Sequence, residues 1–469
     1  SSDLASLLPT AVGLMMLPIY TRYLTPQDYG IVALVLSFQM FLPIILSLKL
    51  GSSLSRFYFE HTGSDLKVFI STLLFVIFML SLTATTIIYI NVDSIVSYIF
   101  PLTLHKYYEL FKIGVIVSFL AIFNNFFINL VRVREKAKLF MKIQLTLFVV
   151  NFIINITEVI ILERGAYGVI EASMISVIIS LLIYTYINKK YLGMTRKFEY
   201  LIEPIKFSFF LIPHSLSGLI FMYSDRIILE KYVTLSAIGL YMLADKIAMI
   251  IKMIVNEFNH AFSPYFIRKS KESKQVAIKE VQNISLIFIY LTSMIVVTIS
   301  LFSVEIVYFL LDKRYFDTWM MIPLLSSAYI FRSLYCFSSS GLFYEKKTGR
   351  VAMITILAGL INIALNILLI PYYGVIAAVY TTIFSFFITF IMSELMSYKI
   401  YYLQLSIKKN IFIVGYMFIS IFFSLSLNKG FFEFEYIDYV YKVIVLIIGL
   451  GIGYILNLFK FNILLKIRD

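Results

Sequence analysis

Apolar residues run through this chain in long stretches that short polar turns separate. A helix needs about 20 residues to cross the hydrocarbon core of a bilayer, at about 1.5 Å per residue. The stretches reach this length and lack the period-2 alternation of barrel strands. We therefore predict 14 membrane-spanning helices, at residues 4–24, 29–50, 67–91, 112–131, 139–162, 166–188, 205–228, 237–258, 284–311, 319–342, 351–370, 374–397, 410–427 and 440–459.

The composition supports a membrane protein. Hydrophobic residues make up 60% of the chain and charged residues 14%, whereas soluble domains have about 45–50% and about 25%. The mean hydropathy is +0.90. So few charges cannot cover so much apolar surface in water, which predicts an all-α integral membrane fold. The chain begins at Ser1 without a methionine, and we expect a trimmed or processed end there.

The distribution of positive charge predicts the topology. The net charge is +13, and 26 of the 40 Lys and Arg residues fall in the loops after even-numbered spans and in the C-terminal tail. About 10 fall in the loops after odd-numbered spans, and the remaining 4 lie within spans. Cytoplasmic loops are enriched in Lys and Arg, so both termini should be cytoplasmic. This bias explains the basic balance without nucleic acid.

The sequence repeats itself at an interval of about 209 residues. One copy contains six spans, and an even number inserts the second copy in the same orientation as the first. The copies should then be related by a pseudo-twofold axis along the membrane normal. The matched segments are Arg22-Tyr23-Leu24-Thr25 with Lys231-Tyr232-Val233-Thr234, Gly30 with Gly239, Glu135-Lys136 with Glu345-Lys346, Asn151 and Asn155 with Asn362 and Asn366, and Tyr167-Gly168-Val169-Ile170 with Tyr373-Gly374-Val375-Ile376.

The repeat predicts three parts. Residues 1–200 form an N-terminal six-helix lobe, residues 201–405 form a C-terminal six-helix lobe, and residues 406–469 add a pair of transmembrane helices outside the repeat.

Several charged residues lie inside predicted spans. Burying a charge in the bilayer is costly, so such residues usually face a water-filled cavity or a partner. Asp245, Lys252 and Asn256 are spaced by seven and four residues, which places them on one helical face. This face either lines a cavity or uses its charges for mutual neutralisation, and the same two interpretations hold for Asp225-Arg226. The cations assigned to spans are Lys49, Lys246, Lys252 and Arg332.

Five segments resemble polysaccharide flippases of the Wzx type, which belong to the multidrug/oligosaccharidyl-lipid/polysaccharide exporter (MOP) superfamily. They are residues 17–30 (LPIYTRYLTPQDYG), 224–229 (SDRIIL) with 239–241 (GLY) after it, 345–348 (EKKT), 362–366 (NIALN) and 370–375 (IPYYGV). The resemblance implies two six-helix lobes in a bacterial inner membrane. It also implies flipping of an undecaprenyl-pyrophosphate-linked oligosaccharide from the cytoplasmic to the outer leaflet. Its partners would be this substrate, the phospholipid membrane, and the polymerase and glycosyltransferases of the same pathway.

A pyrophosphate head group needs several cations, and a sugar chain needs amides and hydroxyls. We expect Lys49, Lys246, Lys252 and Arg332 to converge on one cavity and bind the pyrophosphate. The asparagine pairs either contact sugar or hydrogen-bond between helices. The other candidates are Arg22, Arg56 and Arg226 at the rim, Asp225, Asp245 and Glu257 as ion-coupling acids, and Asn151, Asn155, Asn362 and Asn366 as sugar contacts.

The sequence carries no motif that predicts catalysis, a cofactor or a metal site. Residues 341–348 imitate a P-loop but place Lys346 where its second glycine should stand. Cys336 is the only cysteine, and the four histidines lack ligand spacing. We therefore predict a transporter rather than an enzyme. The alternatives are an exporter of small molecules or teichoic-acid precursors on the same fold and, less well supported, a membrane polymerase of the same pathway.

The topology can be tested with reporter fusions. In loops 131–142 and 188–206, we expect reporters that work only in the cytoplasm to be active and reporters that work only outside it to be inactive, because these loops carry clustered Lys and Arg. A fusion in loop 91–112 serves as the control and should report the opposite side. External reporters in the two basic loops would contradict the topology.

Overall fold

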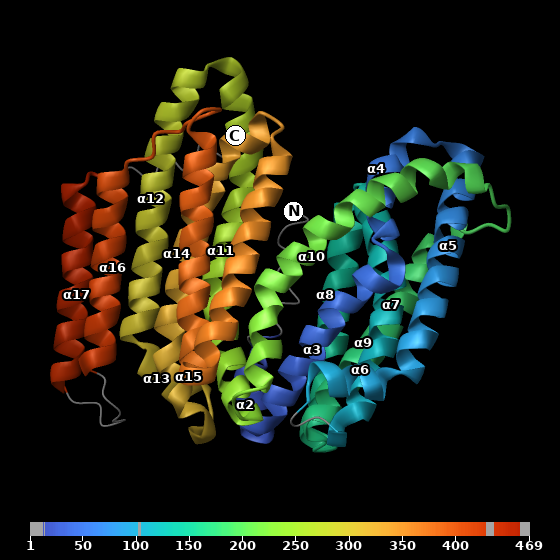
Figure 1. Cartoon of the computed structure of the whole chain (residues 1–469), viewed down its shortest axis with the longest axis horizontal. Helices are drawn as coiled ribbons and strands as arrows, with labels where there is room; N and C mark the ends of the chain where they lie inside the picture. The colour runs from blue at the N-terminus through green and yellow to red at the C-terminus, as the bar shows by residue number, and fades with distance from the viewer. Residues whose placement is uncertain (1–12, 14, 102–104, 428–435, 460–469) are drawn as a thin grey trace. The chain divides into compact units, whose positions relative to one another are not determined.

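All regular structure in the described residues of this computed structural model is helical. The structure describes residues 13, 15–101, 105–427 and 436–459. Helices suit these apolar runs because each satisfies its own backbone N–H and C=O groups, which hydrocarbon cannot do. The helices are α2 (Leu17–Tyr23), α3 (Pro26–Ser47), α4 (Ser53–Phe57), α5 (Gly63–Ile90), α6 (Val92–Ile99), α7 (Tyr108–Val133), α8 (Ala137–Asn155), α9 (Gly165–Asn188), α10 (Ile202–Glu230), α11 (Leu235–Glu272), α12 (Lys274–Leu301), α13 (Ser303–Leu310), α14 (Met321–Tyr344), α15 (Thr348–Ser397), α16 (Ile407–Leu427) and α17 (Tyr436–Ile455) (Figure 1).

Eleven helices in the described part of the chain are long and apolar enough to cross a membrane. α15 has 50 residues and is interrupted by a non-helical backbone at Gly374, so it contains two predicted spans. α11 contains the predicted span 237–258, while span 4–24 lies largely outside the described residues. The all-helical membrane fold is therefore confirmed, and the number 14 stays a prediction.

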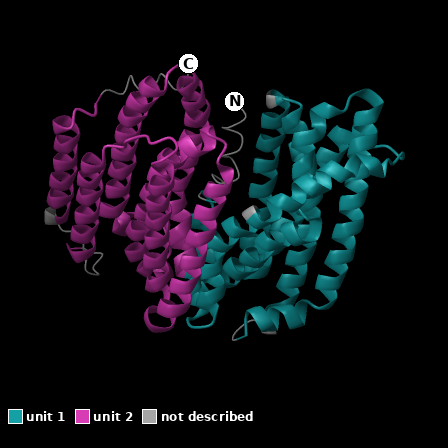
Figure 2. Ribbon diagram, turned by 45° about the horizontal axis from the view of Figure 1, so that its top comes forward, with its two compact units in different colours: residues 1–239 teal, residues 240–469 magenta. Residues whose placement is uncertain are grey.

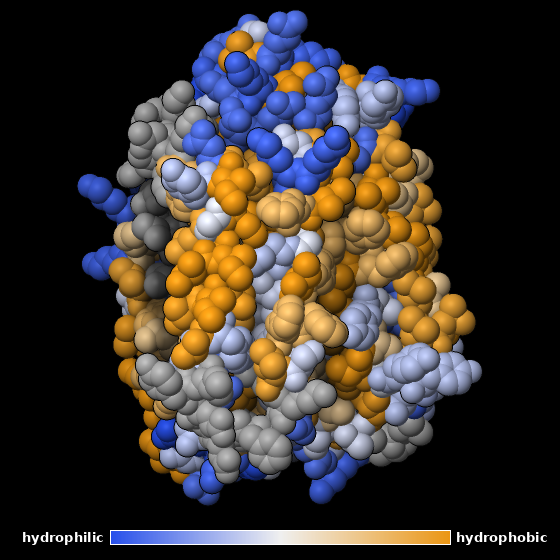
Figure 3. Space-filling model, turned by 90° about the vertical axis from the view of Figure 1, so that its left-hand side faces the viewer, coloured by the Kyte–Doolittle hydropathy of each residue, from blue (hydrophilic) through white to orange (hydrophobic). Residues whose placement is uncertain are grey.

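The surface of the molecule is divided into polar and apolar zones. Viewed over the C-terminal helices, an apolar band lies between hydrophilic ends (Figure 3). On α16 and α17, Ile411 is 66% exposed, Phe422 69% and Ile447 60%. Side chains this apolar and this exposed fit contact with lipid rather than water.

The boundaries of α3 follow from local chemistry, and its end differs from the prediction. At its start, Thr25 and Asp28 form a capping box, in which each side chain accepts a hydrogen bond from the other's backbone N–H. At its end, Leu48 and Lys49 have left-handed φ angles of 48° and 60°. The helix therefore stops at Ser47. The placement of Lys49 within a span over 29–50 was wrong, because no glycine or proline marks this turn.

The chain divides into two compact units, residues 1–239 and 240–469 (Figure 2). In the first unit, α7 packs against α3 and α9, and α10 contacts α3 and α4. In the second unit, α14 packs against α15, and α12 packs against α14, α16 and α17. The division places α10 in the first unit, whereas the repeat assigns it to the second lobe. The three predicted parts stay a prediction.

The C-terminal helices are fixed to the second unit by polar contacts. Ser424 Oγ of α16 donates to Ser300 O of α12 at 2.6 Å, and Tyr290 Oη donates to Gly449 O of α17 at 3.1 Å. Lys442 of α17 forms a buried ion pair with Glu305 of α13. Each contact satisfies a polar group that lipid would leave without a partner.

Two glycines matched by the repeat make one reciprocal contact. A Cβ on Gly30 of α3 would lie 1.9 Å from Leu235 O, and a Cβ on Gly239 of α11 would lie 1.9 Å from Pro26 O. The repeat offset of 209 residues relates Gly30 to Gly239 and Pro26 to Leu235. Each glycine therefore contacts the residue that the repeat matches to the other glycine's contact. A local twofold relation between the two segments produces such exchange. Only glycine permits this close approach of two helix backbones.

The backbone also refines the register of the repeat. Gly374 has a φ of 58°, and the matching left-handed glycine is Gly165, with a φ of 56°. Gly168 is instead helical, within α9. The sequence match of Gly168 with Gly374 is therefore displaced by three residues, because the similar Tyr-Gly-Val-Ile letters do not follow the turn. The corrected offset of 209 equals that of the glycine contact.

We expect Gly239→Ala to destabilise the protein by about 1–3 kcal/mol or more, because its Cβ would overlap the Pro26 carbonyl and force the helices apart. Thermal unfolding in detergent, followed by far-ultraviolet circular dichroism, measures this. Gly218→Ala is the matched control, since nothing lies within 4 Å of a Cβ there. Equal melting temperatures for the two variants would contradict the contact.

Candidate functional site

The polar stripe of α11 faces α14. Tyr329 Oη of α14 donates to Asp245 Oδ1 at 3.2 Å, and Arg332 Nη2 donates to Asn256 Oδ1 at 3.3 Å. Asp245 and Asn256 are the two ends of the stripe, and Lys252 lies between them in the sequence. The predicted alignment on one helical face therefore places both ends against the same neighbouring helix.

Arg332 carries an incompletely satisfied cation. Its Nε atom is buried and has no hydrogen-bond partner among the described residues. Among the described residues, the guanidinium donates a hydrogen bond to a neutral amide, that of Asn256. A guanidinium has five N–H donors and no acceptor. Since no acceptor among the described residues satisfies the buried Nε–H, a bound anion would stabilise this cation.

Two lysines of α11 accompany Arg332 in the second unit. Lys246 and Lys252 are both half-buried within this helix. The second unit thus contains three of the four cations predicted to bind pyrophosphate. The fourth, Lys49, belongs to the first unit and lies half-buried in the turn after α3. The convergence of all four on one cavity stays a prediction.

The three predicted rim arginines differ in their surroundings. Arg22 is exposed near the end of α2, and Arg56 is exposed and forms an ion pair with Glu60 at 2.7 Å. Arg226 is only 6% exposed; its side chain contacts Asp225 Oδ1 at 3.2 Å and donates to Met222 O at 2.8 Å. Burial does not suit a rim position, and the contact favours mutual neutralisation of Asp225 and Arg226.

The three acids proposed for ion coupling also differ. Asp225 is paired with Arg226, and Asp245 accepts a hydrogen bond from Tyr329. Glu257 is half-buried on α11, next to Asn256 in the sequence. No metal-binding group of three or more His, Cys, Asp or Glu residues occurs in the part of the chain that the structure describes.

The asparagine pairs form the same local hydrogen bond in both units. Asn155 Nδ2 donates to Asn151 Oδ1, and Asn366 Nδ2 donates to Asn362 Oδ1 at 3.1 Å. Each pair also bonds outside its own helical segment. Tyr20 Oη of α2 donates to Asn155; from the part of α15 beyond Gly374, Thr381 Oγ1 donates to Asn366 and Ser385 Oγ accepts from Asn362 at 3.1 Å. Asn362 and Asn366 are 2% and 0% exposed. These bonds favour the interhelical interpretation for all but Asn151.

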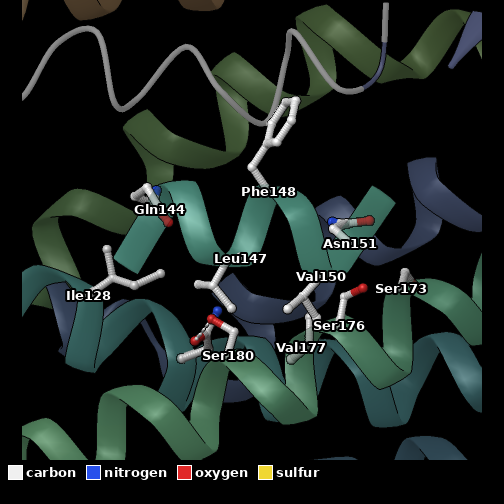
Figure 4. Close-up of a pocket in the computed structure, with 11 residues that line it drawn as sticks. Ile128, Gln144, Leu147, Phe148, Val150, Asn151, Ser173, Ser176, Val177 and Ser180 are labelled. Carbon is white, nitrogen blue, oxygen red and sulfur yellow. Dashed lines mark hydrogen bonds between the residues drawn. The ribbon is translucent and has the colours of Figure 1, made fainter. Parts of the chain in front are cut away.

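Asn151 lines a pocket of about 270 Å³ between α7, α8 and α9 (Figure 4). Sequence reasoning missed most of its polar residues. Ser173, Ser176 and Ser180 recur at intervals of three and four along α9, which places them on one helical face. That pattern, in an otherwise apolar helix, was the signal available in the sequence.

Comparison with solved structures shows that the fold resembles that of known membrane transporters. The lipid II flippase MurJ in an inward closed conformation superposes with a TM-score of 0.75 at 18% identity, over 97% of this chain and 98% of that chain. An inward-facing multidrug resistance MATE family transporter of the MOP superfamily has a TM-score of 0.63 at 15% identity, covering 84% and 95%. A MOP superfamily transporter from Pyrococcus furiosus gives 0.52 at 14%, covering 84% and 93%. At these identities the likeness establishes the fold.

The family follows from the sequence itself. No protein matches in a search of curated sequences. The family model described as "Polysaccharide biosynthesis protein" matches residues 4–270, more than half of the chain. The MurJ-like and MATE-like fold agrees with the predicted resemblance. The chain belongs to the polysaccharide biosynthesis protein family.

Proposed function

We propose that this protein flips an undecaprenyl-pyrophosphate-linked oligosaccharide from the cytoplasmic to the outer leaflet of a bacterial inner membrane, by alternating access. Family and fold support a lipid-linked flippase or a related MOP transporter. The observation that carries the choice of an anionic substrate is the buried Nε of Arg332, which lacks a partner among the described residues.

The charges on α11 and α14 support a diphosphate head group. Lys246 and Lys252 of α11 and Arg332 of α14 belong to the same unit. α11 also carries the acids Glu257 and Asp245, and Asp245 accepts a hydrogen bond from Tyr329. Cations held apart from water repel one another, and an entering diphosphate would relieve this repulsion through charge-assisted hydrogen bonds. Several moderate contacts suit transport, because the substrate must also leave.

The alternatives differ in the charge that they require. An exporter of organic cations on this fold needs carboxylates in its site, whereas Asp225 is paired with Arg226. A teichoic-acid precursor is also anionic and remains the closest competitor. A polymerase generally needs a long external catalytic loop, which this sequence lacks between its predicted spans. We infer a transporter with no resident cofactor, both termini cytoplasmic, and the pathway's polymerase and glycosyltransferases as partners.

Arg332→Ala should lower the flipping rate in proteoliposomes roughly 10- to 100-fold, because a hydrogen bond to a charged group contributes about 1.5–3 kcal/mol. Arg332→Lys should retain more activity, since charge matters more than fork geometry in a moving site. Dithionite quenching of a fluorescent lipid-linked oligosaccharide measures the rate.

Lys206→Ala is the control for this experiment. Lys206 is an exposed lysine that pairs with Glu203 at 3.1 Å, and its loss should leave flipping unchanged. Normal flipping by Arg332→Ala, at equal reconstitution yield, would refute the assignment of Arg332 to substrate binding.

Of the three acids, Glu257 is the best candidate for coupling to an ion gradient, because Asp225 and Asp245 already contact Arg226 and Tyr329. We expect Glu257→Gln to reduce gradient-driven flipping severalfold and to leave flipping without a gradient unchanged. Glu203→Gln, at an exposed ion pair, is the matched control. If collapse of all ion gradients leaves the wild-type rate unchanged, the coupling role of these acids is wrong.

A further inference from the structure

The pocket between α7, α8 and α9 lies within the first unit, so its geometry does not depend on the second. Its volume is about 270 Å³. In Figure 4, Leu147 and Val150 of α8 extend toward Ser176 and Ser180 of α9. The lining residues are Asn124, Ile128, Gln144, Leu147, Phe148, Val150, Asn151, Ser173, Ser176, Val177 and Ser180.

The chemistry of the lining indicates an uncharged ligand. The described residues around the pocket are amides, hydroxyls and apolar side chains, and none of them carries a charge. An ion placed here would lose its hydration without gaining a counter-charge, which is costly in a low-dielectric interior. A neutral molecule rich in hydroxyl groups has no such cost. The pocket therefore differs in kind from the charged polar stripe of α11 and the neighbouring Arg332 of α14.

The polar groups of the pocket retain hydrogen-bonding capacity. Ser180 Oγ donates to Asn124 Oδ1 at 2.7 Å, and Asn155 Nδ2 donates to Asn151 Oδ1. Both amide oxygens are thus engaged, while among the described residues no acceptor takes the N–H donors of Asn124 Nδ2 or Asn151 Nδ2. Each amide nitrogen offers two donors. The bonds to the oxygens hold the amides in a fixed orientation.

Ser176 adds a fully buried hydroxyl. Its Oγ atom has no hydrogen-bond partner among the described residues and borders the same pocket. By contrast, Ser173 Oγ donates to Ile170 O at 2.7 Å, within its own helix. A buried polar atom without a partner costs free energy in a membrane protein. A bound ligand would remove this cost.

The apolar residues of the lining and the volume of the pocket further limit which ligands can bind. A sugar ring presents hydroxyls at its edge and C–H groups on its faces, so it matches a pocket that combines amides with Leu147 and Phe148. Pockets for drug-sized ligands measure about 300–1,000 Å³. A pocket of about 270 Å³ is suited to one sugar ring and too small for an oligosaccharide.

We propose that the α7–α8–α9 pocket binds one uncharged sugar unit of the transported lipid through the amides of Asn124 and Asn151 and the hydroxyl of Ser176. This proposal rests on the proposed function, since it divides recognition between two places: cations hold the diphosphate, and this pocket holds neutral sugar. It predicts that transport of undecaprenyl pyrophosphate without sugar does not depend on the residues of the pocket.

Adjacent asparagines on α7 provide a matched pair of variants. Asn124 lines the pocket, whereas Asn125 is exposed and does not line it. Asn124→Leu and Asn125→Leu therefore make the same chemical change one residue apart. Both are assayed in proteoliposomes with two substrates, undecaprenyl pyrophosphate carrying a neutral oligosaccharide and undecaprenyl pyrophosphate alone.

We expect Asn124→Leu to slow the glycosylated lipid roughly five- to tenfold and to leave the sugar-free lipid unchanged. Asn125→Leu should change neither rate. Equal slowing of both lipids by Asn124→Leu would indicate a folding defect and overturn the assignment. Unchanged transport of the glycosylated lipid would also overturn it and would mean that the pocket holds only water.

A binding measurement separates this proposal from the proposed function. Saturation-transfer NMR with N-acetylglucosamine, on wild-type protein in nanodiscs, should give a signal that Asn124→Leu abolishes and Asn125→Leu retains. Glucuronic acid, which is charged, should give none. Sugar binding without lipid transport would refute the proposed function alone. Absence of binding by wild-type protein, or equal binding by both variants, would refute the pocket.

Discussion

Polar groups within the membrane spans of this protein lie in a solvent that offers no hydrogen bonds, so most of them need a partner from the protein itself. Much of the helix packing follows from this constraint. Hydroxyls within the spans donate to the carbonyl four residues earlier, as Ser37 does to Ala33 and Thr72 does to Val68, both at 2.7 Å. Amides bond in pairs, and Lys442 and Glu305 neutralise one another where α17 meets α13. Several buried atoms among the described residues still lack a partner, and those beside a pocket or the polar stripe of α11 are candidates for contact with a ligand.

Two such places differ in charge, and the difference has functional meaning. Arg332 presents a buried N–H next to the polar stripe of α11, in a setting that an anion would stabilise. The pocket lined by Asn124, Asn151 and Ser176 presents donors without any charge. A lipid-linked oligosaccharide combines an anionic diphosphate with neutral sugar. The protein thus provides separate chemistry for each part of such a substrate, as proposed.

The sequence predicted features that depend on period and composition. Apolar runs located the helices, and the seven-and-four spacing of Asp245, Lys252 and Asn256 placed the stripe on one face of α11. The repeat identified Gly30 and Gly239, whose close packing requires glycine. The apolar runs and the stripe are signals within a single segment, where helical geometry determines the consequence, and the repeat needs only the comparison of two segments of the sequence.

The sequence failed where the answer depends on backbone conformation or on several helices at once. Lys49 was placed inside a span because nothing in its neighbours announces the left-handed turn that ends α3. Gly168 was aligned with Gly374 because letters matched, although Gly165 has the equivalent conformation. The first-unit pocket escaped detection because three helices contribute to it. The spacing of its serines places them on one face of α9, but only the packing of α9 against α7 and α8 shows that this face borders a pocket.

The central claim is that this protein, as the flippase proposed above, recognises the charge of its lipid as well as its sugar. The most direct test compares two lipids with the same oligosaccharide in proteoliposomes of wild-type protein, one joined through pyrophosphate and one through an uncharged ether. The account predicts rapid translocation of the pyrophosphate lipid and a rate for the neutral lipid no greater than that in protein-free vesicles. Equal rates for the two lipids, both above the protein-free rate, would contradict it.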